Sequence, residues 1–414
     1  MSAQRLTVVG INYAPEISGI PPYTTALAEH CADAGMGVTV VTAFPHYPQW
    51  KRYADYSGLT MTEEISGVQV RRRWHYIPAS PRGLKRLVSE LTFGVTSTLA
   101  RWKSPDTVVV VSPALFGATI SMARAALRRG RTAVWVQDLY SQGMQETGEG
   151  SGAVVRIAGA LEGWTLRRAD AVVAIHDAMA SRMVESLGVD RERITVIPNW
   201  THIRASTATR SEAREALGWD PDAFIALHAG NMGSKQGLDN IVEAARLADA
   251  RAGSVEFVML GDGGERSRLE AASAGMTSIR FVDPLPGDSF PLALAAADVL
   301  LVNELPGIRE MAAPSKLTSY FAAGRPVAAA VSADGIVSQI MAKAGAGPVV
   351  TNEEPHALLE ALETLRNDEG ARTAFGAAAR EYWRSNLSAD SALAAWQNVI
   401  SNADRNAPAA HQEP

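Results

Sequence analysis

The sequence has almost no cysteine and no long apolar run, and each absence excludes a class of protein. Its single cysteine, Cys31, excludes an internal disulfide and a multi-cysteine metal site and fits a reducing cytoplasm. We interpret Cys31 as a packed thiol within a helix. No run of about 18 apolar residues occurs, so we expect no bilayer-spanning helix. The first residues enter a predicted strand directly, and we expect no signal peptide.

Three patterns that mark common ligands are also missing. The first β-to-α turn lacks G-x-G-x-x-G spacing, which argues against a nicotinamide cofactor there. No G-x-x-x-x-G-K-[ST] segment is present, which excludes a Walker phosphate loop. Neither H-x-x-x-H nor C-x-x-C spacing occurs, and we expect no bound metal.

Acidic residues are scarce in one stretch of a mildly acidic chain. The formal net charge is −5, yet residues 65–137 hold twelve Lys and Arg residues against only Glu90 and Asp106. This basic 71–131 region indicates an anionic partner: a phosphorylated lipid, a membrane surface or nucleic acid. Solvated helix faces are an equally good interpretation. The cations are Arg71, Arg72, Arg73, Arg82, Lys85, Arg86, Arg101, Lys103, Arg124, Arg128, Arg129 and Arg131.

Short Val-rich segments alternate with helical ones along most of the chain. Near-continuous apolar strands predict parallel sheets covered on both faces. The pattern restarts after a polar linker at residues 201–212, so we expect a bilobed α/β protein of two Rossmann-like domains. The expected strands are 6–10, 38–42, 68–71, 107–111, 133–136, 171–175, 193–198, 224–228, 255–260, 279–282, 299–302, 326–331 and 347–350.

The domain boundaries follow from this restart. We place the first domain at residues 1–200 and the second at 201–375. Helices within 376–403 are expected to lie back across the first domain, and the polar tail 404–414 to be disordered. The expected helices are 22–34, 238–250, 265–274, 290–297, 317–323, 335–344, 370–384 and 389–401.

Glycine-rich turns after strands are candidate anion sites. Gly19 lies in the first β-to-α turn, where backbone amides and a helix N-terminus attract anions, although a plain turn glycine is an alternative. The segment from Gly230 to Gly237 follows a strand, and its Lys235 adds a cation suited to a diphosphate. Arg266 follows a second such turn and is either a phosphate ligand or an exposed helix residue.

The densest signal is Pro314-Ser-Lys-Leu-Thr-Ser-Tyr-Phe-Ala-Ala-Gly-Arg-Pro-Val. Pro314 and Ser315 begin a helix, and Lys316 lies in its first turn. A cation at a helix N-terminus is electrostatically unfavourable unless an anion compensates it. Lys316 is therefore predicted to face a phosphate or carboxylate, with a tolerated exposed lysine as the alternative.

Candidate acids, bases and orienting groups stand just after strands. His46, Asp138 and His176 each lie where open α/β sheets bind ligands, outside the carboxyl ends of strands. Glu310 is a further candidate acid. Each alone is more often a loop or cap residue, but three at one sheet edge favour a site.

Taken together, these motifs resemble those of family 4 retaining glycosyltransferases of the GT-B fold, and most of all the colanic-acid and exopolysaccharide type. The resemblance spans residues 6 to 400, and each motif is loose while their order is specific. The motifs are Asn12-Tyr-Ala-Pro-Glu with Gly19, Thr42-Ala-Phe-Pro-His-Tyr-Pro-Gln-Trp, Val136-Gln-Asp, Pro198-Asn-Trp, Gly230-Asn-Met-Gly-Ser-Lys-Gln-Gly, Gly261-Asp-Gly, and Pro314-Ser-Lys-Leu with Gly324-Arg-Pro-Val.

The resemblance implies an acceptor-binding first domain and a second domain that binds a nucleoside diphosphate sugar, with catalysis in the cleft between them. It implies catalytic roles for Gly19, His46, Asp138 and Glu310, and an acceptor-side position for Tyr23, Tyr47 and His176. The implied donor-binding residues are Asn231, Gly233, Lys235, Arg266, Phe281, Val282, Pro314, Ser315, Lys316, Leu317 and Ser319.

Two positions depart from the family pattern. Many members carry an E-x7-E pair, but Met311 and Ser319 occupy those places here, with Glu310 one residue away. Asn231 stands where an arginine is usual. Exopolysaccharide-type relatives share these changes, so we do not interpret them as loss of activity.

The functional expectation is retaining transfer of a sugar to an acceptor hydroxyl on a polysaccharide, a lipid-linked glycan or a secondary metabolite. A sugar-nucleotide epimerase is the first alternative, and a non-glycosidic coupling enzyme or binding module is the second. No cofactor is expected, because the nucleotide sugar is a substrate and side chains supply the positive charge. We expect no nucleic-acid partner, but peripheral contact with the inner face of an anionic membrane.

Overall fold

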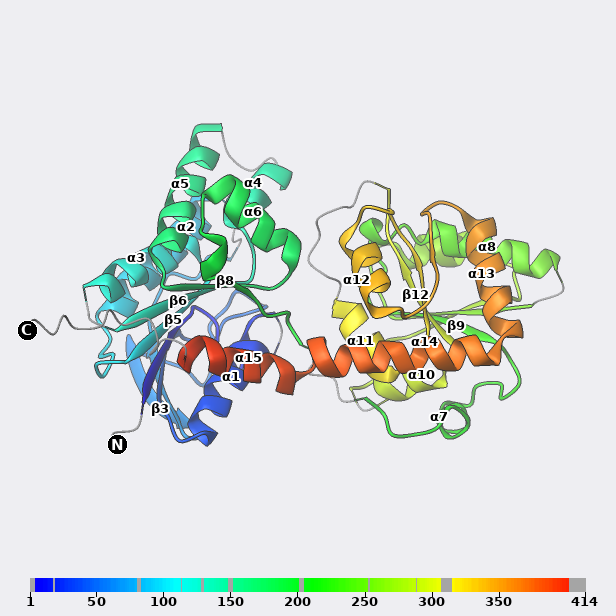
Figure 1. The fold of residues 1–414 in the computed structure, drawn as a ribbon, viewed down its shortest axis with the longest axis horizontal. Coiled ribbons are helices and arrows are strands. Elements are labelled where there is room, and N and C mark those ends of the chain that lie inside the picture. The colour runs from blue at the N-terminus through cyan, green and yellow to red at the C-terminus, as the bar shows by residue number, and fades with distance from the viewer. Residues whose placement is uncertain are drawn as a thin grey trace, which may run out of the picture. The chain divides into compact units, whose positions relative to one another are not determined.

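The computed structural model describes residues 4–17, 19–79, 83–112, 114–127, 130–147, 152–200, 205–251, 254–287, 289–306 and 315–401. Contacts divide the chain into two compact units, one of residues 1–199 with the segment from Ala392 on, and one of Trp200–Ser391 (Figure 1). The expected tail 404–414 lies outside the described residues. Within them, no helix combines the length and apolarity needed to cross a membrane.

Unit 1 is built on an eight-stranded sheet in the order β3-β4-β2-β1-β5-β6-β7-β8. All neighbours are parallel except β3 and β4, which form an antiparallel pair. The strands are β1 (Arg5–Val9), β2 (Gly37–Ala43), β3 (Thr60–Ile65), β4 (Val68–Arg73), β5 (Thr107–Ser112), β6 (Arg131–Val136), β7 (Ala171–Ala174) and β8 (Ile194–Val196). The helices are α1 (Pro21–Asp33), α2 (Gly83–Thr98), α3 (Leu115–Ala126), α4 (Tyr140–Thr147), α5 (Gly152–Arg168) and α6 (Asp177–Leu187).

Both faces of this sheet are covered, which explains its continuous apolar strands. Val108, Val110 and Val134 point to the face packed by α2, α3, α5 and α6. On the other face, Trp135 of β6 meets Trp396 of α15 (Ala389–Ser401), with ring centroids 4.7 Å apart. Figure 1 shows α1 and α15 on this second face. The last helix of the described chain thus completes the core of unit 1.

Unit 2 repeats the architecture with six parallel strands in the order β11-β10-β9-β12-β13-β14. The strands are β9 (Ile225–Ala229), β10 (Glu256–Leu260), β11 (Ile279–Val282), β12 (Val299–Asn303), β13 (Val327–Ala330) and β14 (Val349–Val350). The helices are α7 (Arg210–Leu217), α8 (Asp239–Ala250), α9 (Arg266–Ala272), α10 (Phe290–Ala296), α11 (Ser315–Ala323), α12 (Ile336–Ala344), α13 (Pro355–Asn367) and α14 (Glu369–Tyr382). The predicted α/β class with two Rossmann-like sheets is confirmed.

Differences from the expected elements lie where the apolar pattern is weak. The edge strand β3 was not predicted, because its solvent-facing sequence Thr-Met-Thr-Glu-Glu-Ile has no apolar run. Helix α13 was not predicted either. Helix α14 packs within unit 2, where Arg380 donates to the carbonyls of Ala322 and Ala323 at the end of α11.

Candidate active site

Two glycine-rich loops pack against each other at the carboxyl ends of β9 and β10. A Cβ on Gly261 would stand 2.1 Å from the carbonyl oxygen of Gly230, and one on Gly263 would stand 2.4 Å from that of Met232. The φ angles of Gly261 and Gly263 are +133° and +157°, which other residues rarely adopt. These glycines are therefore required by the contact of one loop with the other.

The loop that follows β9 is held by the side-chain amide of Asn303, a residue that sequence reasoning did not predict. Asn303, the last residue of β12, donates through Nδ2 to the carbonyls of Gln236 (2.9 Å) and Gly237 (2.8 Å). Asn240 donates in turn to Oδ1 of Asn303 at 2.8 Å. These three hydrogen bonds tie the loop to the end of β12 and the start of α8. An asparagine that ends a buried strand was the available signal.

Lys316 lies in the first turn of α11, as predicted, and its ammonium points to the end of β9. Its Nζ is 3.1 Å from Nε2 of His228, a fully buried residue of β9. Burial lowers the pKa of Lys316 to about 8, while the charge of Glu304 opposes that shift. Burial also lowers the pKa of His228, so its ring is neutral and accepts a hydrogen bond from the ammonium.

Glu304 follows β12 directly and was not among the predicted site residues. Burial raises its pKa to about 7, and Lys316 acts in the opposite direction. The charges of the two groups interact at the same sheet edge, and the carboxyl group that acts on Lys316 is itself a weak acid. A carboxylate immediately after a Val-rich strand could have been found from the sequence.

The other predicted cations of this unit differ in their surroundings. Arg266 is engaged by protein groups, with ion pairs to Asp283 (2.7 Å) and Glu270 (2.8 Å) and a hydrogen bond to the Gly261 carbonyl. Lys235 lies in a short 3-10 turn with an exposed side chain. Asn231 is exposed on the same loop, beside Gly233, whose amide donates to Gln236.

The remaining donor-side residues are spread over β11 and α11. Phe281 and Val282 are partly buried on opposite faces of β11. Leu317 is in the core of unit 2, and Ser319 is buried on α11. Glu310 and Pro314 lie outside the described residues, as does the side chain of Ser315.

In unit 1, Gly19 packs against Tyr47 at the carboxyl ends of β1 and β2. Its φ is +79°, and a Cβ there would stand 3.3 Å from Cε1 of the Tyr47 ring. The two segments are tied together by Glu16, a buried carboxylate that accepts from the amides of His46 (2.7 Å) and Tyr47 (2.8 Å). Glu16 ends the motif Asn12-Tyr-Ala-Pro-Glu, but the sequence alone did not predict it as a site residue.

His46 is itself buried rather than presented to solvent. Its Nδ1 lies 3.0 Å from the carbonyl of Phe44 and 3.4 Å from Glu16. Its ring also meets the ring of His75, with centroids 4.6 Å apart. Burial lowers the pKa of His46, while the Glu16 charge raises it. The ring is thus held by the loop that carries Tyr47.

The other predicted residues of unit 1 sit at two further strand ends. Asp138 is exposed after β6. Burial raises the pKa of Glu162, and the charge of Asp138 adds to that shift. Glu162 accepts from the amides of Tyr140 and Ser141 at the start of α4. His176 caps α6, its Nδ1 accepting from the Met179 amide at 3.0 Å.

Tyr23 lies in the first turn of α1, and burial raises the pKa of its hydroxyl. No group of three or more His, Cys, Asp or Glu side chains in the described part of the chain is placed to hold a metal ion.

Family models match both halves of the chain. A glycosyl transferase 4-like domain matches residues 18–200, and a glycosyl transferases group 1 domain matches residues 209–382. An Escherichia coli K12 protein named as a colanic acid biosynthesis glycosyl transferase is 35% identical over 337 residues, or 77% of this chain and 81% of the relative. A 2-deoxystreptamine glucosyltransferase of Streptomyces kanamyceticus is 32% identical over 41% of this chain and 45% of its own length.

Solved structures agree on the fold. Sucrose-phosphate synthase of Thermosynechococcus elongatus matches with a TM-score of 0.71 at 16% identity, covering 98% of this chain and 100% of that one. The Anabaena protein HepE, solved in complex with UDP-glucose, matches with a TM-score of 0.63 at 15% identity, over 96% of this chain and 99% of that one. The predicted GT-B fold is confirmed, and the chain belongs to the group 1, family 4 glycosyltransferases that use nucleotide sugars.

Proposed function

We propose that the chain is a retaining glycosyltransferase whose second unit binds a uridine diphosphate sugar. The observation that carries the proposal is the Lys316 ammonium, partly buried at a helix N-terminus and set against the weak carboxylate of Glu304. A diphosphate would compensate this buried charge and use the positive end of the α11 dipole.

The difficult step is departure of the nucleoside diphosphate from the anomeric carbon. As the bond from that carbon to the β-phosphate oxygen breaks, charge develops on the oxygen, and the acceptor hydroxyl attacks from the same face. Lys316, the exposed Lys235 and the amides of α11 would stabilise the leaving diphosphate, which takes the acceptor's proton. Fixed charges of this kind contribute several kcal/mol.

The choice of nucleotide and acceptor draws on the relatives. HepE was solved with UDP-glucose, so we place a uridine nucleotide first. The relatives named for colanic acid and for 2-deoxystreptamine differ in acceptor. The Escherichia coli relative matches far more of the chain, so we propose a growing, lipid-linked glycan as acceptor and keep a small metabolite as the rival.

On the first unit, we propose that Gly19, Tyr47 and Tyr23 form the acceptor side. The exposed Asp138 would orient the hydroxyl, and the buried His46 would hold the loop that carries Tyr47. The support is the packing of Gly19 on Tyr47 and the Glu16 hydrogen bonds that hold this loop. The Nδ1 atom of His176 caps α6 and is therefore occupied. We keep His176 on the acceptor side because its backbone lies at the end of β7.

A thermal-shift screen with UDP, GDP, TDP and their sugars tests the donor. A ligand at about 100 times its Kd stabilises by about 2.7 kcal/mol, a clear shift in Tm. We expect one nucleotide and its sugar to raise the Tm. We expect the free nucleotide to be released from that nucleotide sugar only when an acceptor is added. A changed sugar still attached to its nucleotide would instead indicate an epimerase. Binding without turnover over a broad acceptor set would indicate a silent or non-glycosidic protein.

A further inference from the structure

Helix α2 presents an apolar face to solvent. Val88, Leu91 and Val95 follow one another at helical spacing, and Leu99 comes directly after the end of the helix. All four are exposed, Val95 by 53% and Leu99 by 76%. A helix on the surface of a globular protein normally places its polar residues outward. The exposed face of α2 is therefore a candidate contact surface for a partner molecule or a membrane.

The buried face of the same helix is unusually polar. Ser89, Glu90 and Ser97 are all at most 4% exposed, beside Phe93. Burial raises the pKa of Glu90 to about 7, although Arg86 lies 3.1 Å away. Gly94 and Gly117 let α2 approach α3 closely, because a Cβ on Gly94 would stand 3.0 Å from Cα of Gly117. The orientation of α2 is thus fixed by its packing, and the apolar residues are held outward.

Two aromatic side chains extend this face. Trp74 and Tyr76 are each 37% exposed in the segment after β4. The hydroxyl of Thr96 on α2 donates to the Trp74 carbonyl at 2.8 Å, and the Tyr76 amide donates to the Thr92 hydroxyl at 3.0 Å. We call these six residues the α2 patch: Trp74, Tyr76, Val88, Leu91, Val95 and Leu99.

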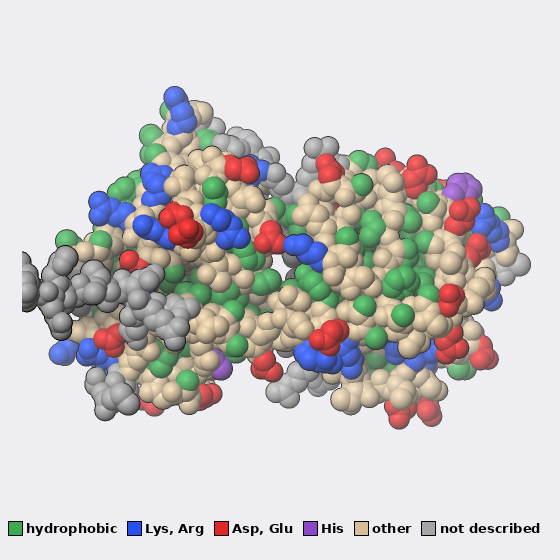
Figure 2. All heavy atoms as spheres, viewed as in Figure 1, with side chains coloured by type: hydrophobic (Ala, Val, Ile, Leu, Met, Phe, Trp, Pro, Cys, Tyr) green, Lys and Arg blue, Asp and Glu red, His purple; other side chains and the backbone are tan. Residues whose placement is uncertain are grey.

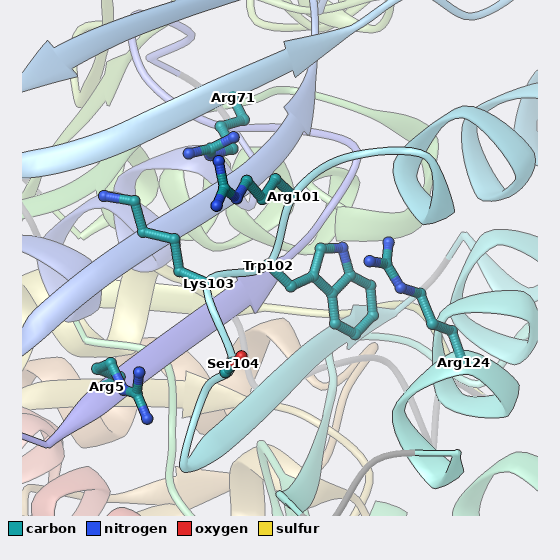
Figure 3. Close-up of a pocket in the computed structure, with 7 residues that line it drawn as sticks. All are labelled: Arg5, Arg71, Arg101, Trp102, Lys103, Ser104 and Arg124. Atoms are coloured by element: carbon teal, nitrogen blue, oxygen red, sulfur yellow. The ribbon is translucent and has the colours of Figure 1, made fainter.

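Cations border the α2 patch where α2 ends. Arg71, Arg101 and Lys103 line a pocket of about 690 Å³, shown with its other lining side chains in Figure 3. Arg124 lies over the Trp102 ring at 4.2 Å in the same pocket. From residue 67 to residue 105 the sequence has one carboxylate, the buried Glu90. The exposed charge of this segment is therefore positive, and the exposed carboxylates Glu64 and Asp106 flank it along the chain.

The structure also reduces the number of cations in the basic 71–131 region that can be assigned to contact with a partner. Arg72 is fully buried, paired with Glu63 and bonded to the Ala14 carbonyl, so it cannot meet a partner. Arg82, Arg128 and Arg129 lie outside the described residues. Figure 2 shows Lys and Arg side chains beside hydrophobic ones on one face of unit 1.

We propose that the α2 patch docks on the surface of an anionic lipid bilayer. Apolar helix residues enter the headgroup boundary, Trp and Tyr favour that interface, and cations contact lipid phosphates. A second copy of the chain is a poorer occupant. In a symmetric dimer the patch of one copy would meet the patch of the other, and the cations that border the two patches would be brought into one interface.

Co-flotation with vesicles tests this docking. The full-length protein is mixed with phosphatidylcholine vesicles with or without phosphatidylglycerol, at low and high salt. Binding is expected only to the anionic vesicles and is expected to weaken with salt. Leu91→Glu/Val95→Glu should reduce the bound fraction at least about tenfold by placing charge in the apolar contact. Arg101→Glu/Lys103→Glu should do the same through the electrostatic term.

Val154→Glu/Ile157→Glu is the matched control, because both residues are exposed and apolar on α5 of the same unit. Circular dichroism and Tm establish that each variant is folded. No binding by the unchanged protein, equal binding to neutral vesicles, or an equal loss in the α5 control would overturn the proposal. A dimer of the unchanged protein that Leu91→Glu/Val95→Glu converts to a monomer would assign the patch to a second copy. Vesicle binding needs neither donor nor acceptor, so its outcome is independent of the proposed transfer reaction.

Discussion

The Nζ atom of Lys316 lies 3.1 Å from Nε2 of His228, joining the first turn of α11 to the end of β9. His228 is fully buried and its pKa is lowered, first by burial, so the neutral ring accepts a hydrogen bond from the ammonium without carrying a charge of its own. The hydrogen bond orients the ammonium but does not neutralise it. Its charge is balanced by the weakly acidic carboxyl group of Glu304 and by any bound anion. This pair is the basis of the donor-site predictions.

Replacing Lys316 by methionine should remove charge stabilisation while keeping the volume of the side chain. We expect kcat with the best nucleotide sugar to fall about 100- to 1000-fold, which corresponds to about 3 to 4 kcal/mol. Lys343→Met on the exposed face of α12 is the control and should leave kcat unchanged. Steady-state kinetics of both variants decide the matter, and equal rates for Lys316→Met and the unchanged enzyme would exclude Lys316 from the reaction.

Donor affinity and stability should respond oppositely to alkaline pH. The folded-state pKa of Lys316 is about 8, below the ordinary value of 10.5. Above pH 8 the ammonium is lost, so the Kd for UDP should rise, approaching tenfold per pH unit. Between pH 8 and 10.5 the unfolded chain holds more protons, so this residue's contribution to stability improves as pH rises.

Glu304 acts at lower pH, because its pKa is raised from 4.5 to about 7. Between these values the folded protein holds more protons, so its contribution to stability declines as pH rises. Calorimetry of UDP binding in buffers of different ionisation enthalpy should show proton uptake between pH 7 and 8. Proton uptake that is unchanged in Lys316→Met/Glu304→Gln would contradict the assignment.

The packing of one glycine loop on the other can be tested at adjacent positions. Gly263→Ala places a Cβ 2.4 Å from the Met232 carbonyl at a φ of +157°. We expect the variant to be destabilised by about 2 kcal/mol or more and to lose donor-induced stabilisation. At Gly264 a Cβ meets nothing within 4 Å, so Gly264→Ala should change the free energy of unfolding by at most about 0.5 kcal/mol. Denaturant unfolding of the pair measures the difference, and similar stabilities would refute the packing argument.

Gly19 and Gly35 separate backbone strain from contact with Tyr47. Both have positive φ, +79° and +84°, but only a Cβ at Gly19 would contact the Tyr47 ring. Alanine at either position should cost about 1 to 2 kcal/mol of stability. Only Gly19→Ala should also lower kcat/KM for the acceptor, because it displaces the loop that carries Tyr47. If Gly35→Ala reduces turnover equally, the effect belongs to strain alone.

Local patterns in the sequence determined the two parallel sheets. Strands buried on both faces must be apolar throughout, so the Val-rich runs predicted nearly all of them, and the polar edge strand β3 escaped. The helix start that places Lys316 in its first turn was also local information.

Only the tertiary structure decided which groups face one another. His228, Glu304 and Lys316 come from three separate segments, and their juxtaposition depends on strand order. The same holds for the carboxylate Glu16 beneath Tyr47 and for Arg266, whose charge is engaged by Asp283. Periodicity can predict that α2 has an apolar side, but only the packing of Gly94 on Gly117 turns that side outward. Spacing along a chain sets which residues share a face, whereas long-range packing sets what each face meets.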